Sequence, residues 1–440
     1  MAEGFPFKDS LTPILGALVS ELYPDARNRI FPPEVVVMAS VAAVLARDLT
    51  LRSAVVRNNA DRATRGQPPS SLNTAAFSDA RMRLDEGLFR RATIEFANQT
   101  SKQVQASTFW GEMTPYVIDG TTLTANDSED NQAAFPQHAS QANGVGFPIL
   151  RVVVVQALST GMVCDMASAA FKGKGTGEMA LAREVVPTLE GDVLLLGDRY
   201  FPSYFFMADL LKRGWNGIFP THAAREADFR KGEWLGYRDH IVSWDRPVRS
   251  DWMTREEYET YPRSLRLRET EVREKKSGND RIVLVTTLLD ETEFSTSRLA
   301  GMYKKRWKVE LALRDLKATF EMGHIAANTP EMVRKLIWSH LLAYNVLRWH
   351  MLNASSLFDT DLEHVSVTAA ATVISANAVL IGTTKKRALP ALFSSLYSQI
   401  VQVPVGIRPG RIEPRAVKKR PKPRRYLMEK RSAWHERQSA

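Results

Sequence analysis

The stretch between residues 110 and 220 constrains the fold of this chain most, because short apolar runs alternate there with turn residues and helical patterns. Ser159-Thr160-Gly161 separates two runs rich in β-forming residues, which predicts a hairpin. The expected strands are 149–157, 162–170, 193–196 and 215–220, and the expected helices are 176–189 and 204–211. Strands that alternate with helices in this way predict an α/β fold.

Two aspartates stand where apolar runs of this stretch end. Asp119 follows a short apolar run and precedes Gly120, so we expect it at the carboxyl end of a strand that runs into a turn. Asp198 comes soon after the fully apolar run Val193–Leu196, and we expect it at the end of that strand. An aspartate at a strand end can also cap the next turn, so each one alone is consistent with a structural role.

A third acidic residue lies much later, in a window with helical spacing. The residues concerned are Tyr303, Arg306, Glu310 and Lys317. They fall within about 60° of one another if residues 303–320 form one helix. An apolar stripe lies about a quarter turn away and consists of Val309, Leu313, Leu316 and Phe320. Such a helix can present a carboxylate and cations to a groove, as metal-assisted chemistry on phosphate would use, although solvated surface ion pairs have the same spacing.

Two aspartates at strand ends followed by a glutamate on a helix form the carboxylate arrangement of RNase H-like nucleases and transposases. The chain resembles the DDE transposases of bacterial insertion sequences, in the insertion-sequence-four type with the Tyr-Arg-Glu-Lys signature. Residues 303–317 fill that signature with its spacing intact. The other similar segments are 118–131, 198–201, 74–84 and 409–422, so the resemblance covers almost the whole chain.

The resemblance implies an RNase H-like catalytic core in which Asp119, Asp198 and Glu310 hold two divalent ions, Mg²⁺ or Mn²⁺. It also implies hydrolysis at a transposon end, followed by strand transfer from the freed 3′-hydroxyl. The partners would be double-stranded DNA, as terminal inverted repeats and target, and a second copy in a homodimer. The expected DNA contacts are Tyr303, Arg306, Arg314, Lys317, Arg81, Arg415, Lys418, Lys419 and Arg420.

The expected organisation is an α/β chain whose RNase H-like core is interrupted by a β-rich insertion. The gap of 112 positions from Asp198 to Glu310 requires such an insertion. We expect a helical DNA-binding domain over 1–105, the core over 106–221 and 298–385, the insertion over 222–297, and a helix with a basic tail over 386–440.

The insertion is dense in charge and in aromatic residues. Its alternating stretches 265–270 and 281–288 predict strands. The aromatic residues considered are Trp234, Tyr237, Trp244 and Trp252. They either stack on a base displaced at the cut site or fill a small β core.

The N-terminal region shows helix signals at three places. Pro32-Pro33 opens one helix, Thr50 can cap a second that runs through Val56, and Thr74 or Ser78 can cap a third that carries Arg81. Residues 57–71 are expected to form a polar loop. The pattern fits a helix-turn-helix that enters the major groove, or a plain helical bundle packed on the core.

Composition limits the compartment and the class of site. The 440 residues are 44% hydrophobic, which supports two or three domains with a packed core. The single cysteine, Cys164, excludes a disulfide framework and a cysteine-cluster zinc site, and we expect a reducing, cytoplasmic setting. We expect neither a signal peptide nor a membrane span, because the longest apolar stretch, 35–46, is too short.

Charge is concentrated at the C-terminal end. Residues 406–440 contain twelve Lys or Arg and three Glu, a balance of +9 in a chain whose formal net charge is +10. Five prolines between 404 and 423 oppose regular helix there. This tail is either a counterion-releasing arm for a polyanion or a solubilising extension.

Three functions remain open on the residues alone. The first is a DNA transposase, the second a nuclease on the same core that cuts but does not join, and the third an inactivated DNA-binding relative. The intact set of Asp119, Asp198 and Glu310 argues against the third.

Overall fold

The computed structural model describes residues 8–25, 30–64, 66–104, 110–222, 224–274, 280–405 and 428–439. The chain forms two compact units, each assembled from segments that are distant in sequence. The first, called the sheet unit here, comprises residues 90–121 and 151–316. The second, called the helical unit, comprises residues 1–89, 122–150 and 317–440.

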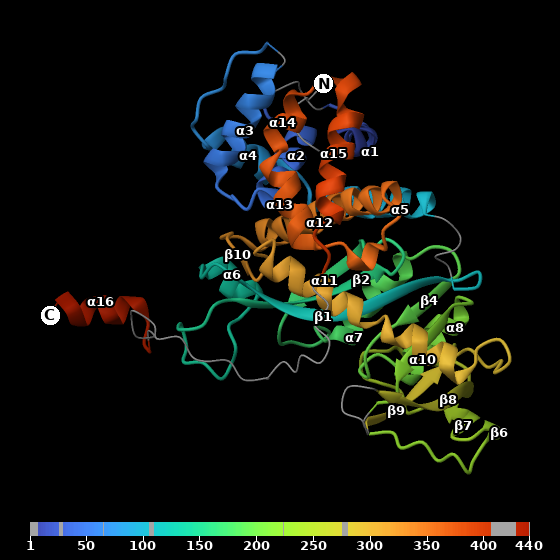
Figure 1. The fold of residues 1–440 in the computed structure, drawn as a ribbon. Helices are drawn as coiled ribbons and strands as arrows, with labels where there is room; N and C mark the ends of the chain where they lie inside the picture. The colour runs from blue at the N-terminus through green and yellow to red at the C-terminus, as the bar shows by residue number, and fades with distance from the viewer. Residues whose placement is uncertain are drawn as a thin grey trace. The chain divides into compact units, whose positions relative to one another are not determined.

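A ten-stranded mixed sheet confirms the expected α/β class (Figure 1). Its order is β3-β2-β1-β4-β5-β9-β8-β7-β6, and β10 pairs with the end of β1. The strands are β1 (Thr114–Ala125), β2 (Ile149–Ala157), β3 (Val163–Ala170), β4 (Val193–Leu196), β5 (Asn216–Pro220), β6 (Glu233–Gly236), β7 (Asp239–Asp245), β8 (Ser264–Glu274), β9 (Asp280–Thr286) and β10 (His324–Ile325). Strands β1, β4 and β5 run parallel, which fits the fully buried, uniformly apolar β4.

The helices expected in this region are present. In the sheet unit they are α7 (Glu178–Val185), α8 (Tyr204–Lys212), α9 (Arg255–Glu259), α10 (Thr296–Lys304) and most of α11 (Trp307–Ala318). A short 3-10 turn, Val186–Thr188, continues α7. The hairpin between β2 and β3 closes through a hydrogen bond from Ala157 N to Met162 O at 3.0 Å. Helix α9 was not anticipated; a capping box between Thr254 and Glu257 starts it.

The strands of residues 222–297, the segment expected to be a β-rich insertion, continue the same sheet. Strand β9 pairs antiparallel with β5, and β8, β7 and β6 follow outward from it. The expected strands 265–270 and 281–288 correspond to parts of β8 and β9. The apolar residues of the insertion are therefore buried on a surface that continues from the parallel strands.

The prediction that a strand ends at Asp119 is wrong. Strand β1 continues through Gly120 to Ala125, and its far end pairs with β10 at Thr124 and Ala125. β-Branched threonines after the glycine favour the extended chain, and β10 offers them a partner that is 200 residues away in sequence. Asp119 therefore lies inside a strand.

The prediction of one continuous helix over residues 303–320 is also wrong. Helix α10 ends at Lys304 and α11 begins at Trp307. Hydrogen bonds from residues 305, 306, 308 and 309 to the carbonyl three positions back tighten the chain between the two helices. A periodicity argument assumes 3.6 residues per turn throughout, so it misplaces Tyr303 relative to the later residues.

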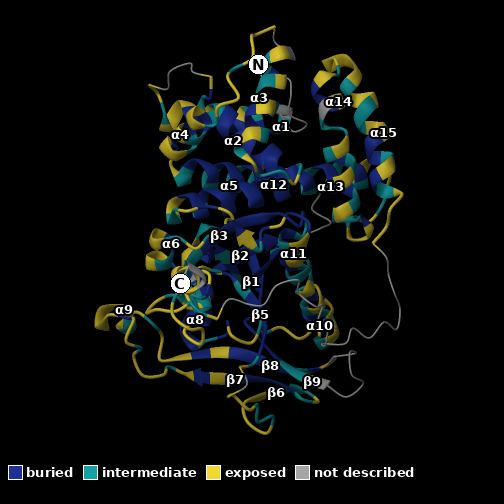
Figure 2. Cartoon of the chain, turned by 90° about the vertical axis from the view of Figure 1, so that its left-hand side faces the viewer, coloured by how far each residue is buried: buried dark blue, intermediate teal, exposed yellow. Residues whose placement is uncertain are grey.

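The helical unit is built around the long helix α12 (Pro330–Leu357). Thr329 caps its start, accepting a hydrogen bond from Met332 N at 3.3 Å, and Pro330 occupies the first turn. Helix α12 is buried over most of its length and packs on α2, α13 and α15 (Figure 2). The remaining helices of this unit are α1 (Lys8–Leu22), α2 (Pro33–Leu45), α3 (Leu51–Thr64), α4 (Ala75–Arg83), α6 (Glu129–Ala134), α13 (Val367–Ala376), α14 (Ala378–Thr383), α15 (Leu389–Val401) and α16 (Arg431–Ser439), while α5 (Glu86–Gln103) begins in it.

Two N-terminal details correct the sequence predictions. Thr50 does cap α3, but the helix continues to Thr64, through part of the expected loop 57–71. Its polar residues Asn58 and Asp61 are fully buried, so the buried face does not look apolar in the sequence. At α4 the side chain of Thr74 makes no cap; Asn73 Oδ1 accepts from Ala75 N instead, at 2.9 Å.

Within the described segments, no helix has both the length and the apolar character needed to cross a membrane.

Candidate catalytic site

The pairing register of β1 and β4 brings Asp119 and Asp198 together. The strands pair in parallel from Thr114 opposite Val193 to Val117 opposite Leu196, a constant offset of 79 positions. The same offset places Asp119 opposite Asp198, two positions beyond the last pair. Neighbouring strands lie about 4.8 Å apart, so the two aspartates lie near each other at the carboxyl end of β4, in the interior of the sheet.

Asp119 is held in an environment that opposes its charge. Burial is the largest cause, and it raises the pKa of Asp119 to about 6. The Gly120 N–H, which donates to Asp119 Oδ1 at 2.8 Å, and the Arg306 guanidinium act in the opposite direction. Asp198 and Glu310 raise the pKa further, so the three predicted carboxylates act electrostatically on one another.

Asp198 is positioned by the chain immediately around it. Its Oδ1 accepts a hydrogen bond from Tyr200 N at 2.8 Å, while the Tyr200 ring is exposed. Gly197 lets the chain leave the sheet close to β1, because a Cβ there would lie 2.8 Å from Phe201 and 3.0 Å from Ile118. A side chain at position 197 would therefore displace the aspartate that follows it.

Glu310 is paired with a cation of the signature. Arg306 Nη2 lies 2.6 Å from Glu310 Oε1, and the guanidinium lies 5.9 Å from the centre of the Tyr303 ring. Neither partner of the ion pair is fully buried. The structure thus brings Tyr303, Arg306 and Glu310 together although they lie on two helices and the turn between them.

The donor chemistry of this site fits a hard divalent cation, since Asp119, Asp198 and Glu310 supply only carboxylate oxygens. As they stand, no three His, Cys, Asp or Glu side chains in the described part of the chain are gathered to hold an ion. The Arg306–Glu310 pair explains why Glu310 is not gathered with the aspartates. The guanidinium of Arg306 supplies the positive charge that a metal ion would supply to Glu310.

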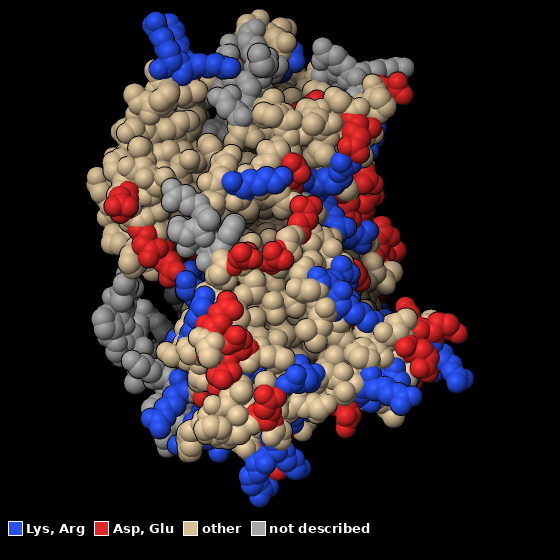
Figure 3. Space-filling view, turned by 90° about the vertical axis from the view of Figure 1, so that its right-hand side faces the viewer, with Lys and Arg blue, Asp and Glu red and all other residues tan. Residues whose placement is uncertain are grey.

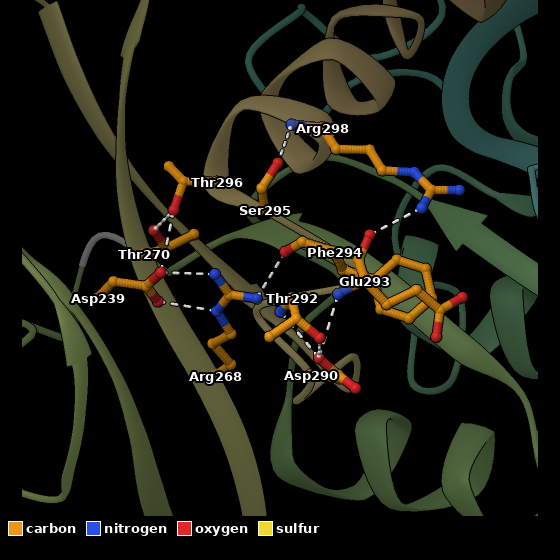
Figure 4. A network of polar contacts seen from close by, with 10 residues as sticks. All are labelled: Asp239, Arg268, Thr270, Asp290, Thr292, Glu293, Phe294, Ser295, Thr296 and Arg298. Atoms are coloured by element: carbon orange, nitrogen blue, oxygen red, sulfur yellow. Dashed lines mark hydrogen bonds and ion pairs between the residues drawn. The ribbon is translucent and has the colours of Figure 1, made fainter.

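A buried network ties the insertion to the start of α10 (Figure 4). Arg268 on β8 donates to both oxygens of Asp239 on β7, at 2.8 and 2.5 Å, and to Phe294 O at 2.7 Å. Thr296, the first residue of α10, donates to Asp239 Oδ2 at 3.0 Å. Arg268 is only 1% exposed. The insertion strands thereby fix the helix that leads to Tyr303.

The other residues predicted to contact DNA have different surroundings. Lys317 lies on the last turn of α11, and partial burial lowers its pKa. Arg314 is exposed and lies 3.4 Å from Asp315 Oδ1. Arg81 is engaged by packing: burial lowers its pKa to about 10, its Nη2 lies 2.9 Å from Met332 Sδ, and its guanidinium lies 6.0 Å from the centre of the Phe77 ring. Arg415, Lys418, Lys419 and Arg420 lie outside the described residues.

Glu178, the first residue of α7, is a further acidic residue that packs against β1. A Cβ on Gly120 would lie 2.7 Å from Glu178 Cδ, so this carboxylate sits directly against the residue after Asp119. Burial raises the pKa of Glu178, and the charge of Asp198 raises it further, while Arg151 lowers it. An acidic residue in the first turn of a helix is common, so nothing in the sequence singles it out.

The aromatic residues of the insertion divide into two groups. Trp244 is 3% exposed, and its Nε1 donates to the buried Glu269 at 2.9 Å, so it belongs to the core. Trp252 packs under Arg183, whose guanidinium lies 4.1 Å from the ring. Trp234 and Tyr237, on and beside β6, are 73% and 87% exposed.

Charge on the described surface is mixed in sign. Figure 3 shows Lys and Arg interspersed with Asp and Glu over the face that it draws. Residues 1–405 carry a formal net charge of only +1, because +9 of the total +10 belongs to residues 406–440. Long-range attraction to a polyanion therefore depends mainly on the C-terminal segment.

Comparison with known proteins identifies the family of this chain. The family model for the Transposase DDE domain matches residues 110–346, more than half of the chain, and this range includes Asp119, Asp198 and Glu310. The chain therefore belongs to the DDE transposase family, and it is a DNA transposase of the insertion-sequence-four type. Membership also implies the use of divalent metal ions.

Individual proteins are similar to this chain over different shares of its length. The transposase InsG for insertion sequence element IS4 of Escherichia coli (strain K12) is 25% identical over 400 residues, which cover 90% of this chain and 87% of that protein. A transposase for insertion sequence element IS421 of Escherichia coli is 38% identical over 61 residues, 14% of this chain and 16% of that protein. A solved structure of the piggyBac transposase synaptic complex with hairpin DNA is 12% identical, with a TM-score of 0.41 over 89% of this chain and 84% of that one.

Proposed function

We propose that this transposase binds the terminal inverted repeats of its element, cleaves DNA there with two divalent ions, Mg²⁺ or Mn²⁺, and joins the freed 3′-hydroxyl to target DNA. The observation that carries the proposal is the shared register of β1 and β4, which sets Asp119 opposite Asp198 within the electrostatic reach of Glu310. The core that carries these residues is of the RNase H-like type.

In this proposal Asp119, Asp198 and Glu310 hold the ions. Bound divalent ions stabilise the attacking and leaving oxygens of a phosphodiester and lower the pKa of bound water. Side chains of the protein would bind the phosphates of the DNA. Arg306 is a planar cation suited to a phosphate with two oxygens exposed, and Lys317 supplies a point charge. Arg306 is paired with Glu310 at 2.6 Å, and it would be available to a phosphate if Glu310 held a metal ion instead.

The other DNA contacts fall into a local and a long-range set. Tyr303 and Arg314 flank the site on α10 and α11 and would contact the backbone near the cut. The C-terminal residues Arg415, Lys418, Lys419 and Arg420 would attract DNA with little sequence preference. A homodimer would pair the two ends.

Cleavage and joining on one labelled end test the proposal. Mg²⁺ or Mn²⁺ should support cleavage, whereas Ca²⁺ should allow binding with little cutting because its looser coordination positions water poorly. Asp119→Asn and Asp198→Asn should bind the end and fail to cut it. Robust cleavage in chelator would overturn the two-metal mechanism, and cutting without joined product would make the protein a nuclease.

The exposed aromatic pair adds a second testable contact. We propose that Trp234 stacks on an unpaired base near the cut, because it is 73% exposed and carries no core role like that of Trp244. Trp234→Ala should weaken binding to an end with an unpaired base by roughly 1–3 kcal/mol and leave fully paired DNA nearly unaffected. Tyr237→Ala serves as the matched variant, and equal losses on both substrates would contradict the stacking role.

The C-terminal segment should set the salt dependence of binding. If about six of its twelve cations meet phosphates, removing residues 406–440 should reduce the log–log salt slope by about 5. The measurement is DNA affinity from low to moderate salt for the full chain and the truncated one. An unchanged slope would mean that the segment only aids solubility.

A further inference from the structure

We propose that His222 is a further DNA-binding residue of the candidate site, which donates a hydrogen bond from its Nε2–H to a phosphate oxygen of the DNA next to the cut. The inference rests on the proposed function, because it takes Asp119, Asp198 and Glu310 as the residues around which DNA is cut. Its evidence is separate from the evidence for these carboxylates, since His222 follows β5 and lies outside the Tyr-Arg-Glu-Lys signature.

Strand β5 ends beside Asp198. It pairs in parallel with β4 at a constant offset of 22 positions, and the last pair is Leu196 opposite Ile218. The same offset places Pro220, the last residue of β5, opposite Asp198. His222 follows two positions later, so it lies at the carboxyl ends of the parallel strands. Ligands of open α/β sheets bind at these strand ends.

The ring of His222 contacts the turn that holds Asp198. It meets the Tyr200 ring edge to face, with the ring centres 6.2 Å apart. Tyr200 is the residue whose backbone N–H donates to Asp198 Oδ1 at 2.8 Å. The backbone just before His222 is still fixed to the sheet, because Thr221 N donates to Val283 O of β9 at 2.8 Å. His222 is therefore an exposed side chain on a fixed backbone, next to an expected metal ligand.

The hydrogen bond at Nδ1 determines what the other ring nitrogen of His222 can do. The backbone N–H of Ala224 donates to His222 Nδ1 at 3.2 Å, so Nδ1 is an acceptor. The proton of the neutral ring is then on Nε2. Among the described residues, none forms a hydrogen bond with this Nε2, which leaves a donor on an exposed side chain. A phosphate oxygen only accepts hydrogen bonds, and side-chain donors commonly bind it in DNA complexes.

Two substitutions separate a DNA contact from a role in the local turn. His222→Asn keeps an acceptor for the Ala224 N–H but removes the donor at Nε2. His222→Gln keeps a donor near the position of Nε2 but loses the acceptor. Binding of the full chain to one labelled end in Ca²⁺ is measured for both variants. His222→Asn should weaken end binding about tenfold or more, because a hydrogen bond to a charged group is lost, whereas His222→Gln should retain most of the affinity.

Neutral phosphates identify the contact. Ends that carry a single methylphosphonate at each position around the cut are bound by the original chain and by His222→Asn. At the contacted phosphate, the loss caused by His222→Asn should disappear, since the charged acceptor is already missing. A loss of the same size with every one of these ends would overturn the inference.

The matched control is His364→Asn, which makes the same change at an exposed histidine of the helical unit and should leave end binding unaltered. Normal binding by His222→Asn with impaired binding by His222→Gln would overturn the inference, because His222 would then only cap its own turn. Normal binding by both variants would overturn it as well. Cleavage by the original chain in Mg²⁺ separates the two proposals. If the original chain cuts and His222→Asn binds normally, only the histidine contact fails; if the original chain neither binds nor cuts the end, both proposals fail.

Discussion

Among the arginine–carboxylate pairs of the sheet unit, Arg268–Asp239 and Arg306–Glu310 have surroundings that differ sharply. In the insertion, Arg268 and Asp239 form two hydrogen bonds with each other, and Phe294 O and Thr296 take up further polar capacity. At the candidate site, Arg306 and Glu310 meet through one close contact of 2.6 Å and remain partly exposed. Both pairs involve α10 or the residues just after it, so they lie at the two ends of one short helix.

The difference separates a structural pair from an exchangeable one. A buried pair with its hydrogen bonds complete is costly to break on one side, because the remaining charge has no water to solvate it. A half-exposed pair contributes little to stability, since water can replace either partner. The insertion pair therefore holds α10 in place, whereas the pair at Glu310 can open for a metal ion and a phosphate.

The largest expected effect is on the cleavage activity that depends on the Arg306–Glu310 pair. Glu310→Gln should reduce end cleavage about 10⁴-fold, on the order of 5 kcal/mol in the barrier, because it removes an anionic ligand but keeps size and helix propensity. Arg306→Ala should instead weaken end binding first. Cleavage and binding on one labelled end are measured for both variants. A near-normal rate in Glu310→Gln would mean that this pair, too, is only structural.

The next effect is on the free energy of unfolding, to which Arg268 and Arg306 should contribute differently. Arg268→Met should lower the free energy of unfolding by about 3–5 kcal/mol, because Asp239 remains buried without its cation. Arg306→Met should change it by less than about 1 kcal/mol. Denaturant unfolding of the two variants provides the comparison. Adding Asp239→Leu to Arg268→Met should recover much of the loss, and a failure to recover would point to the Phe294 and Thr296 contacts as the main contribution.

The smallest effect is a pH dependence that belongs to the open site alone. The pKa of Asp119 is about 6 in the folded chain and 3.8 as the ordinary value, so the folded state binds the proton more tightly. The stability of the metal-free protein should therefore fall, by on the order of 1–2 kcal/mol, as pH rises from about 4 to about 6, and then level off. Asp119→Asn should reduce this slope, leaving the smaller part that belongs to other carboxyl groups with a raised pKa, such as Glu178. An undiminished slope in Asp119→Asn would place the titration on another group.

The local sequence predicted most elements of the fold. Apolar runs with turn residues between them identified β2, β3, β4 and β5, and the alternating stretches of the insertion identified β8 and β9. The elements whose ends were predicted wrongly share one cause. Strand β1 continues past Asp119 because β10 pairs with it, and α3 continues past Val56 because polar residues are buried on its inner face. Neither the pairing with β10 nor the burial of the inner face of α3 can be predicted from the sequence of a few neighbouring residues.

Residue type and local spacing were enough to identify which residues can carry the chemistry: Asp119, Asp198 and Glu310, and the cations spaced around the last of these. How these residues meet depends on the folded chain. The offset of 79 positions between β1 and β4 sets the aspartates opposite each other, and a tight turn after α10 brings Arg306 to Glu310. The packing of Glu178 against Gly120 likewise depends on how α7 lies on β1. The physical reason is that residue type and spacing are written along the chain, whereas register and packing depend on partners tens to hundreds of residues away.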